Sequence, residues 1–200
     1  MKSLFIFITF YSIGVLYSQN SIQGSIETPE MQVFYEGIPV ELICQANGNY
    51  KQVLMSVPSP FTAAQGSAGS VITIQCTGIT MDGKQVDLGE KKFYVKKAPK
   101  PELTWGSNED GSIVNVIPSK LSVGYSDNVP FNSAKAKFVI DSYSISAIGL
   151  EGVLEGEGSQ IKEEHITNLK KLKGNYNISI QVRFSGVTSG IVSGLYLLEL

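Results

Sequence analysis

Two cysteines, Cys44 and Cys76, are the residues of this chain that could form a covalent crosslink. Each one alternates with apolar residues and so shares an apolar strand face with them: Val40, Leu42 and Cys44 in one segment, Ile72, Ile74 and Cys76 in the other. Two inward thiols predict either a disulfide, which would stabilise the fold by about 3–4 kcal/mol, or two buried free thiols. Metal binding is not expected, because two cysteines and one distant histidine make a poor ligand set.

Acid–base chemistry has few candidates. His165 stands beside Ile166 in a predicted helix, where packing is a better interpretation than catalysis. Glu151, Glu155 and Glu157 alternate with glycine, which favours a solvated hairpin over a general acid–base pair. The sequence holds neither a Gly-x-Ser-x-Gly elbow nor a phosphate-binding loop. We therefore expect a protein that is not an enzyme, with no catalytic residue, metal or cofactor.

The charge of the chain argues against a nucleic-acid partner. The formal net charge is -2, and 17% of the residues are charged. Such a balance provides no strong field to attract nucleic acid or an anionic membrane. A chain with 42% hydrophobic residues and 20 glycines fits a globular extracytoplasmic β protein.

The N-terminus has the pattern of a leader. Lys2 precedes an apolar run from Leu4 to Tyr17, and the small residue Ser18 follows. The run is shorter than the ~20 residues that a membrane-spanning helix needs. Residues 1–18 are therefore predicted to be a secretory signal peptide, with an uncleaved anchor as the alternative. No other integral membrane span is expected, which places the protein in the periplasm or outside the cell.

Short strands are predicted along residues 19–97. They fall at 31–37, 39–49, 50–60, 71–79 and 91–97, with a polar lead-in at 20–30 and a loop at 61–70. Asp82-Gly83 is typical of a hairpin turn between the last two. Short strands at this spacing predict a first β-sandwich domain of immunoglobulin type.

A proline-rich linker is predicted at residues 98–102. Pro99 and Pro101 lack an N–H and cannot sit inside a sheet ladder, so we expect a short, stiff joint between two separately cored domains. The lysines before it are interpreted as solvated flanks of an edge strand, with a basic binding patch as the alternative. Trp105, the single tryptophan, could pack as a wedge between the domains or offer a ligand platform.

Residues 103–200 are predicted to be a second β-sandwich domain that contains one helix. The register of the alternating stretch 138–147 changes near Asp141, which indicates a bulge. Residues 121–132 are typical of a loop. The helix is predicted near 160–173, with Ser159 as its N-cap and Gly174 at its end. The fold class is thus mainly β, with two consecutive Ig-like sandwiches.

Several motifs resemble a known family. The run Phe93, Val95, Lys96, Lys97, Pro99 and Pro101 is similar to the Phe-x-Val-Lys-Lys-x-Pro-x-Pro segment that joins the two C-terminal periplasmic domains of the gliding-motility protein GldM. The helix and strand at 163–186 resemble its last domain, and the opening of the preceding domain is matched at 34–48, where Ile38-Pro39-Val40 lacks the family's Asn. The resemblance covers about 165 residues, in the right order.

The resemblance implies an envelope setting in bacteria of the Bacteroidetes group and kinship with type IX secretion and gliding machinery. In that family the periplasmic arm works as a dimer and transmits motion from a membrane motor. This chain departs from the pattern, because family members begin with a membrane helix and a long shaft. The motor role therefore does not carry over, whereas the partner-binding role of the tip could.

These observations predict a protein–protein interaction module. We expect its partners to be other envelope proteins, type IX secretion or gliding components among them, and a homodimer is a further expected assembly. The candidate contact residues are Tyr94, Lys96, Lys97 and Trp105. The alternative is a secreted carbohydrate-binding or hydrolase-accessory β-sandwich, which a pocket of convergent carboxylates around 151–157 would favour.

Overall fold

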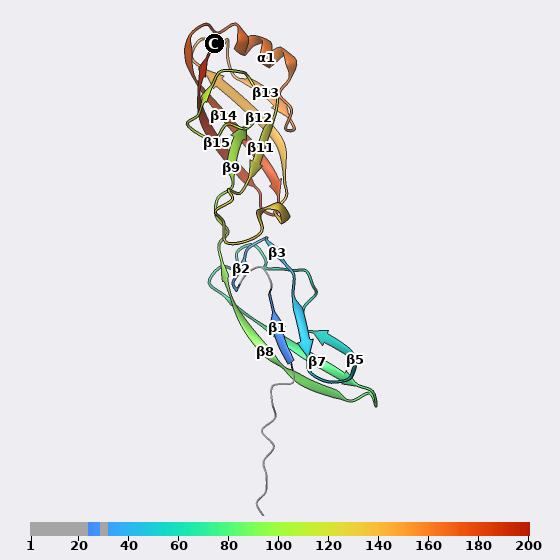
Figure 1. Ribbon diagram of the computed structural model, residues 1–200. Helices are drawn as coiled ribbons and strands as arrows, with labels where there is room; N and C mark the ends of the chain where they lie inside the picture. The colour runs from blue at the N-terminus through green and yellow to red at the C-terminus, as the bar shows by residue number, and fades with distance from the viewer. Residues whose placement is uncertain (1–23, 29–31) are drawn as a thin grey trace, which may run out of the picture.

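The computed structural model describes residues 24–28 and 32–200. The predicted signal peptide, residues 1–18, lies outside the described residues. Figure 1 shows two β domains stacked end to end, with one α-helix at the far end of the second. The predicted fold class, mainly β with two consecutive Ig-like sandwiches, is confirmed.

The first domain is built on a four-stranded sheet of order β2-β8-β7-β5. Its strands are β2 (Phe34–Tyr35), β5 (Tyr50–Met55), β7 (Val71–Thr80) and β8 (Gln85–Lys96). β7 and β8 form the expected hairpin through Gly83, whose φ of 85° suits glycine. The predicted edge strand at 91–97 needs correction, because β2 pairs with β8 at Val95 and Lys96.

Two short ribbons accompany this sheet. β1 (Gly24–Glu27) pairs with β4 (Ile43–Ala46), and β3 (Pro39–Val40) pairs with β6 (Phe61–Thr62). The predictions of a polar lead-in at 20–30 and a loop at 61–70 were therefore wrong at β1 and β6. Both strands are too short to show a clear alternation, and their pairing partners decide their conformation. Buried aromatic rings fill the core, where Phe34 and Phe93 stack with centroids 4.5 Å apart.

The second domain has a five-stranded sheet of order β10-β15-β14-β12-β13. The strands are β10 (Ile113–Val114), β12 (Phe138–Ala147), β13 (Leu154–Glu157), β14 (Asn175–Gly186) and β15 (Gly190–Glu199). In β14 every second residue from Ile178 to Phe184 is buried. The predicted bulge is present, since the register of β12 shifts between Ile140 and Ser142.

A second layer covers the inner face of this sheet. β9 (Glu102–Trp105) pairs with β11 (Leu121–Gly124), and α1 (Glu163–Lys170) contributes Ile166 and Leu169 to the same core. β11 corrects the prediction of a loop at 121–132. The short 3-10 helix η1 (Ser133–Lys135) begins directly after that segment.

The helix begins later than predicted. Its N-cap is Lys162, which makes no side-chain capping bond. Ser159 instead accepts a backbone hydrogen bond from Leu121 at 2.8 Å, and Ile161 donates one to Ser119 at 2.8 Å. Residues 159–161 are thus held in extended pairing, so Ser159 cannot cap a helix there.

The two domains have distinct hydrophobic cores, but the chain crosses between them more than once. Phe131 and Ala136, which follow the linker in sequence, are buried in the core of the first domain. The joint therefore consists of the linker together with the segment 125–138 of the second half. This differs from the expectation of two domains that meet at the proline-rich linker 98–102 alone.

Candidate interaction surfaces

Cys44 and Cys76 form a disulfide with a Cα–Cα distance of 6.3 Å. It ties β4 to β7, and so the β1–β4 ribbon to the main sheet of the first domain. Closing a loop with a sequence separation of 32 residues is worth about 3–4 kcal/mol in the chain-entropy model. A structural disulfide is typical of an oxidising compartment outside the cytoplasm.

Tyr94 and Lys96 lie on the solvent-facing side of β8. Tyr94 is 64% exposed and pairs across the strands with Val71, which is 48% exposed. The exposed Lys92 and Lys96 stand two positions away on either side of Tyr94 along the same face. This arrangement forms a small apolar patch between two cations.

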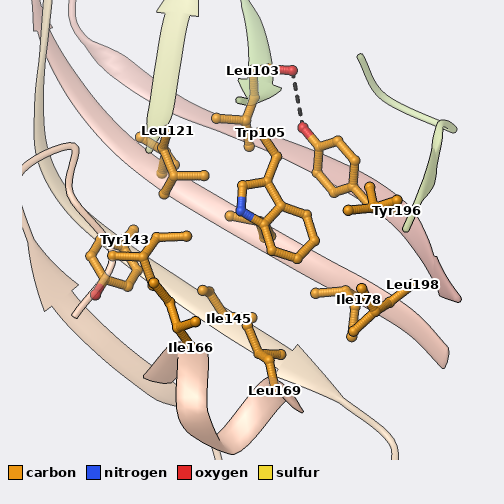
Figure 2. Close-up of a cluster of buried hydrophobic side chains, with 14 of the residues drawn as sticks. Leu103, Trp105, Leu121, Tyr143, Ile145, Ile166, Leu169, Ile178, Tyr196 and Leu198 are labelled. Atoms are coloured by element: carbon orange, nitrogen blue, oxygen red, sulfur yellow. Dashed lines mark hydrogen bonds between the residues drawn. The ribbon is translucent and has the colours of Figure 1, made fainter. Parts of the chain in front are cut away.

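The prediction that Trp105 is a contact residue was wrong. Its side chain is fully buried in the core of the second domain and cannot contact a partner. Figure 2 shows the indole between Leu121 and Tyr196, enclosed by the sheet and α1. Its Nε1 donates to the carbonyl oxygen of Pro118 at 2.9 Å. Trp105 therefore packs inside one domain, and the expected wedge between domains is also wrong.

Tyr196 fixes β9 over the sheet. Its ring meets the indole of Trp105 edge-on, with centroids 5.5 Å apart, and its hydroxyl donates to the carbonyl oxygen of Leu103 at 3.1 Å. Burial, together with the nearby carboxylate of Asp110, raises the pKa of Tyr196 to about 12. The hydroxyl thus stays protonated and keeps its bond across the physiological range.

His165 is buried and packs against Tyr143. The Tyr143 hydroxyl accepts the backbone N–H of Lys162 at 2.9 Å and lies 3.0 Å from Nδ1 of His165. The hydroxyl and Nδ1 share one hydrogen bond, in which the imidazole tautomer sets the donor. The pKa of His165 is lowered from its ordinary value. Burial is the largest cause, Lys162 adds to it, and the Glu164 carboxylate acts in the opposite direction. These contacts fasten the start of α1 to β12.

A second surface, the sheet hollow, lies on the outer face of the second domain. Its volume is about 610 Å³. Cross-strand neighbours line it in two rows, Glu157–Ser142–Arg183–Ile191 and Glu155–Ser144–Gln181. The serines of the middle strand are short and the side chains on both flanks are long, which explains the depression. Beneath it, Gly156 leaves room for the Tyr143 ring, because a Cβ there would lie 2.3 Å from Cζ.

A third surface, the joint groove, lies between the domains and has a volume of about 230 Å³. Residues 97–101 line one side and residues 188–192 the other, with Glu36, Gln65 and Phe184 completing it. Gln65 Nε2 donates to the carbonyl oxygen of Val187 at 3.0 Å, which links the two domains. The buried Glu36 carboxylate accepts the N–H of Ala68 at 2.6 Å.

The structure thus separates the four predicted contact residues. Tyr94 and Lys96 share an exposed face of the first domain, Lys97 belongs to the joint groove, and Trp105 is buried. Sequence reasoning missed both the sheet hollow and the joint groove. The alternation of Ser142, Ser144 and Arg183 with buried neighbours could have indicated an outer polar face, but only the fold places 188–192 opposite the linker.

Among the described residues, no helix is both long and apolar enough to cross a bilayer. In the same part of the chain, no group of three or more His, Cys, Asp or Glu side chains could hold a metal ion.

Comparison with known proteins finds no matching family and no matching curated protein. Among solved structures, the chain is similar to the fibronectin(III)-like modules of Clostridium thermocellum CbhA, with 14% identity, a TM-score of 0.29, and coverage of 88% of this chain and 93% of that one. It is also similar to the extracellular cadherin domains 1–5 of protocadherin gamma B2, with 10% identity, a TM-score of 0.25, and coverage of 88% and 39%. At TM-scores this low, the fold assignment rests on the strands and cores described above.

Proposed function

We propose that this protein is a non-enzymatic protein–protein interaction module of the cell envelope, whose two β domains form one stiff rod. The disulfide between Cys44 and Cys76 supports an extracytoplasmic setting. Exposed apolar side chains on the first domain, such as Tyr94 and Val71, supply contact area of the kind that interfaces use.

The observation that carries this proposal is a chain of aromatic rings across the joint. Tyr35 of the first domain meets Phe131 at 5.2 Å, Phe131 meets Tyr125 at 5.0 Å, Tyr125 meets Phe138 at 5.2 Å and Phe138 meets Phe184 at 5.5 Å, all between ring centroids. Each such contact adds about 0.5–1.5 kcal/mol beyond area burial. Side chains that interlock in this way resist bending, so a partner held at one end keeps a fixed position relative to the other.

The finer proposal is that the module acts with type IX secretion or gliding machinery, in the manner of the C-terminal domains of GldM. Its support is the sequence resemblance around Phe93–Pro101 and in residues 163–186. A two-domain rod with the joint at that motif is what such a tip would need. The periplasm is the corresponding location.

The test is an affinity capture from envelope extract of a gliding Bacteroidetes species, with the purified chain as bait and a Tyr94→Glu variant as control. We expect secretion or gliding subunits to be enriched by the parent chain and less by the variant. Capture of glycans with no envelope protein would overturn the proposal. Capture of other envelope proteins alone would overturn the finer assignment and leave the general one.

A second candidate function is carbohydrate binding at the sheet hollow. The observation that favours it is the presence of Glu155 and Glu157 beside Arg183 and Gln181 in one hollow. Carboxylates, amides and guanidinium groups are suitable hydrogen-bond partners for sugar hydroxyls. A glycan array with the parent chain and Arg183→Ala tests it, and binding that the substitution leaves unchanged would exclude the hollow.

A further inference from the structure

We propose that the free edge of β15 at Ile191 and Ser193 accepts an extended acidic peptide as an added strand. This inference rests on the proposed interaction function and names the surface and partner class for it. Strand addition at a sheet edge supplies main-chain hydrogen bonds, and flanking side chains supply specificity.

Part of β15 directs its backbone groups away from β14. Leu195 donates its N–H to Asp110 Oδ1 at 2.6 Å and accepts the N–H of Gly111 at 2.8 Å, both on the side away from β14. Backbone groups alternate in direction along an antiparallel strand, and the β14–β15 register has no shift. Ile191 and Ser193 therefore direct their N–H and C=O groups to the same outer edge as Leu195.

Among the described residues, this part of the edge has no pairing partner. β10 pairs with β15 at Leu197 and Leu198 only. Within residues 24–28 and 32–200, no hydrogen bond engages the outer backbone groups of Ile191 or Ser193. An added strand would thus extend the sheet in line with β10, along an edge that already accepts a strand further on.

The joint groove lies beside this edge. Residues 188–192 form one wall of the joint groove, and the other wall is the linker, whose Pro99 and Pro101 have no N–H to pair with β15. The linker therefore cannot close onto the edge as a strand, and a space of about 230 Å³ stays open beside it. Ile191 is 56% exposed and offers an apolar contact at the same place.

Two lysines determine the exposed charge of the groove. Lys97 and Lys100 line the groove, and in the described part of the chain neither forms an ion pair. The carboxylate of Glu36 on the same groove is buried and already accepts the N–H of Ala68. The exposed charge at the groove is therefore positive, which favours acidic side chains on the incoming peptide.

Other strand edges fit less well. At β13, the Nζ of Lys162 lies over the edge and donates to the carbonyl oxygen of Glu155 at 3.4 Å, as a protecting lysine does. The edge of β5 is open at Val53 and Met55, but neither residue lines any of the three surfaces described above. β5 thus offers a matched control edge.

The test uses two fluorescein-labelled ten-residue peptides, one alternating Glu with Val and one alternating Lys with Val, and the full chain. Fluorescence anisotropy gives the affinity, and amide hydrogen exchange locates the site. We expect only the acidic peptide to bind, and we expect it to protect the amides of Ile191 and Ser193 from exchange. Ile191→Pro, which removes one edge N–H, should abolish binding, whereas Val53→Pro should not.

The contribution of the two groove lysines has its own variant. The double variant Lys97→Gln with Lys100→Gln should lower the affinity for the acidic peptide by about three- to tenfold. It should also reduce the salt dependence of binding. Equal binding of both peptides, protection at Val53 and Met55, or no binding of the acidic peptide would overturn the proposal. If envelope partners are still captured, and equally by Ile191→Pro, the edge inference fails while the proposed function stands.

Discussion

The ring of Phe131 packs on the ring of Tyr35, with centroids 5.2 Å apart, although the linker separates the two residues in the chain. Phe131 is 7% exposed and belongs to the core of the first domain. This contact makes the second half of the chain a structural part of the first domain. The two domains continue one another end to end (Figure 1).

Phe131→Ala should both destabilise the chain and loosen the joint. Removing a buried phenylalanine costs about 3–5 kcal/mol, and this one also holds the two domains together. Urea unfolding and small-angle scattering measure the two effects. The control is Tyr125→Phe, which keeps the ring but removes a buried hydroxyl that has no hydrogen-bond partner among the described residues. We expect it to be neutral or stabilising. Unchanged stability in Phe131→Ala would contradict the assigned burial.

Replacing Pro99 and Pro101 with glycine should have a small effect by itself. The prolines stiffen the linker, but the aromatic rings and the bond from Gln65 to Val187 hold the joint independently. We expect the scattering profile to change little in the double-glycine variant and strongly when Phe131→Ala is added. A large change with the glycines alone would show that the linker governs the angle.

The disulfide should be present in every molecule and should stabilise the fold. We expect no free-thiol labelling of the unfolded chain without reductant, because Cys44 and Cys76 are bonded to each other. Cys44→Ala with Cys76→Ala should lower the free energy of unfolding by about 3–4 kcal/mol, mainly through greater freedom of the unfolded chain. Two labelled thiols per unreduced chain would remove the bridge from the account.

Acidification should weaken the second domain through His165. Burial lowers the pKa of His165 in the folded state below its ordinary value of 6.5. The unfolded chain therefore binds the proton more readily, and stability is full above pH 6.5 and falls as the pH decreases toward the folded-state pKa. Urea unfolding at several pH values should show a flatter profile for His165→Gln. An identical pH dependence in both proteins would exclude the histidine as the cause.

Part of this fold could be predicted because its signals are local. The alternation of β14, the bulge near Asp141 and the inward direction of both thiols follow from residue spacing alone. The start of α1 could not be predicted, since Ser159 is a good N-cap in isolation and only its pairing with Leu121 keeps it extended.

The surfaces depend on contacts between segments far apart in the sequence. Trp105 is amphipathic and suits an interface as well as a core. It lies in the core because residues of β11 and β15 pack around it. Likewise, nothing in the pattern of 125–138 shows that Phe131 joins the first core. The joint groove exists because that segment and the linker bring 188–192 beside Lys97.

The most direct test of the central claim is whether the two domains tumble as one body. Residual dipolar couplings of backbone amides, measured for strands of both domains in one alignment medium, report the orientation of each. If the two domains form one stiff rod, a single alignment tensor fits β7 and β8 together with β12 and β14. Two tensors of clearly different magnitude would mean that the domains reorient independently, and they would contradict the stiff rod on which the proposed function rests.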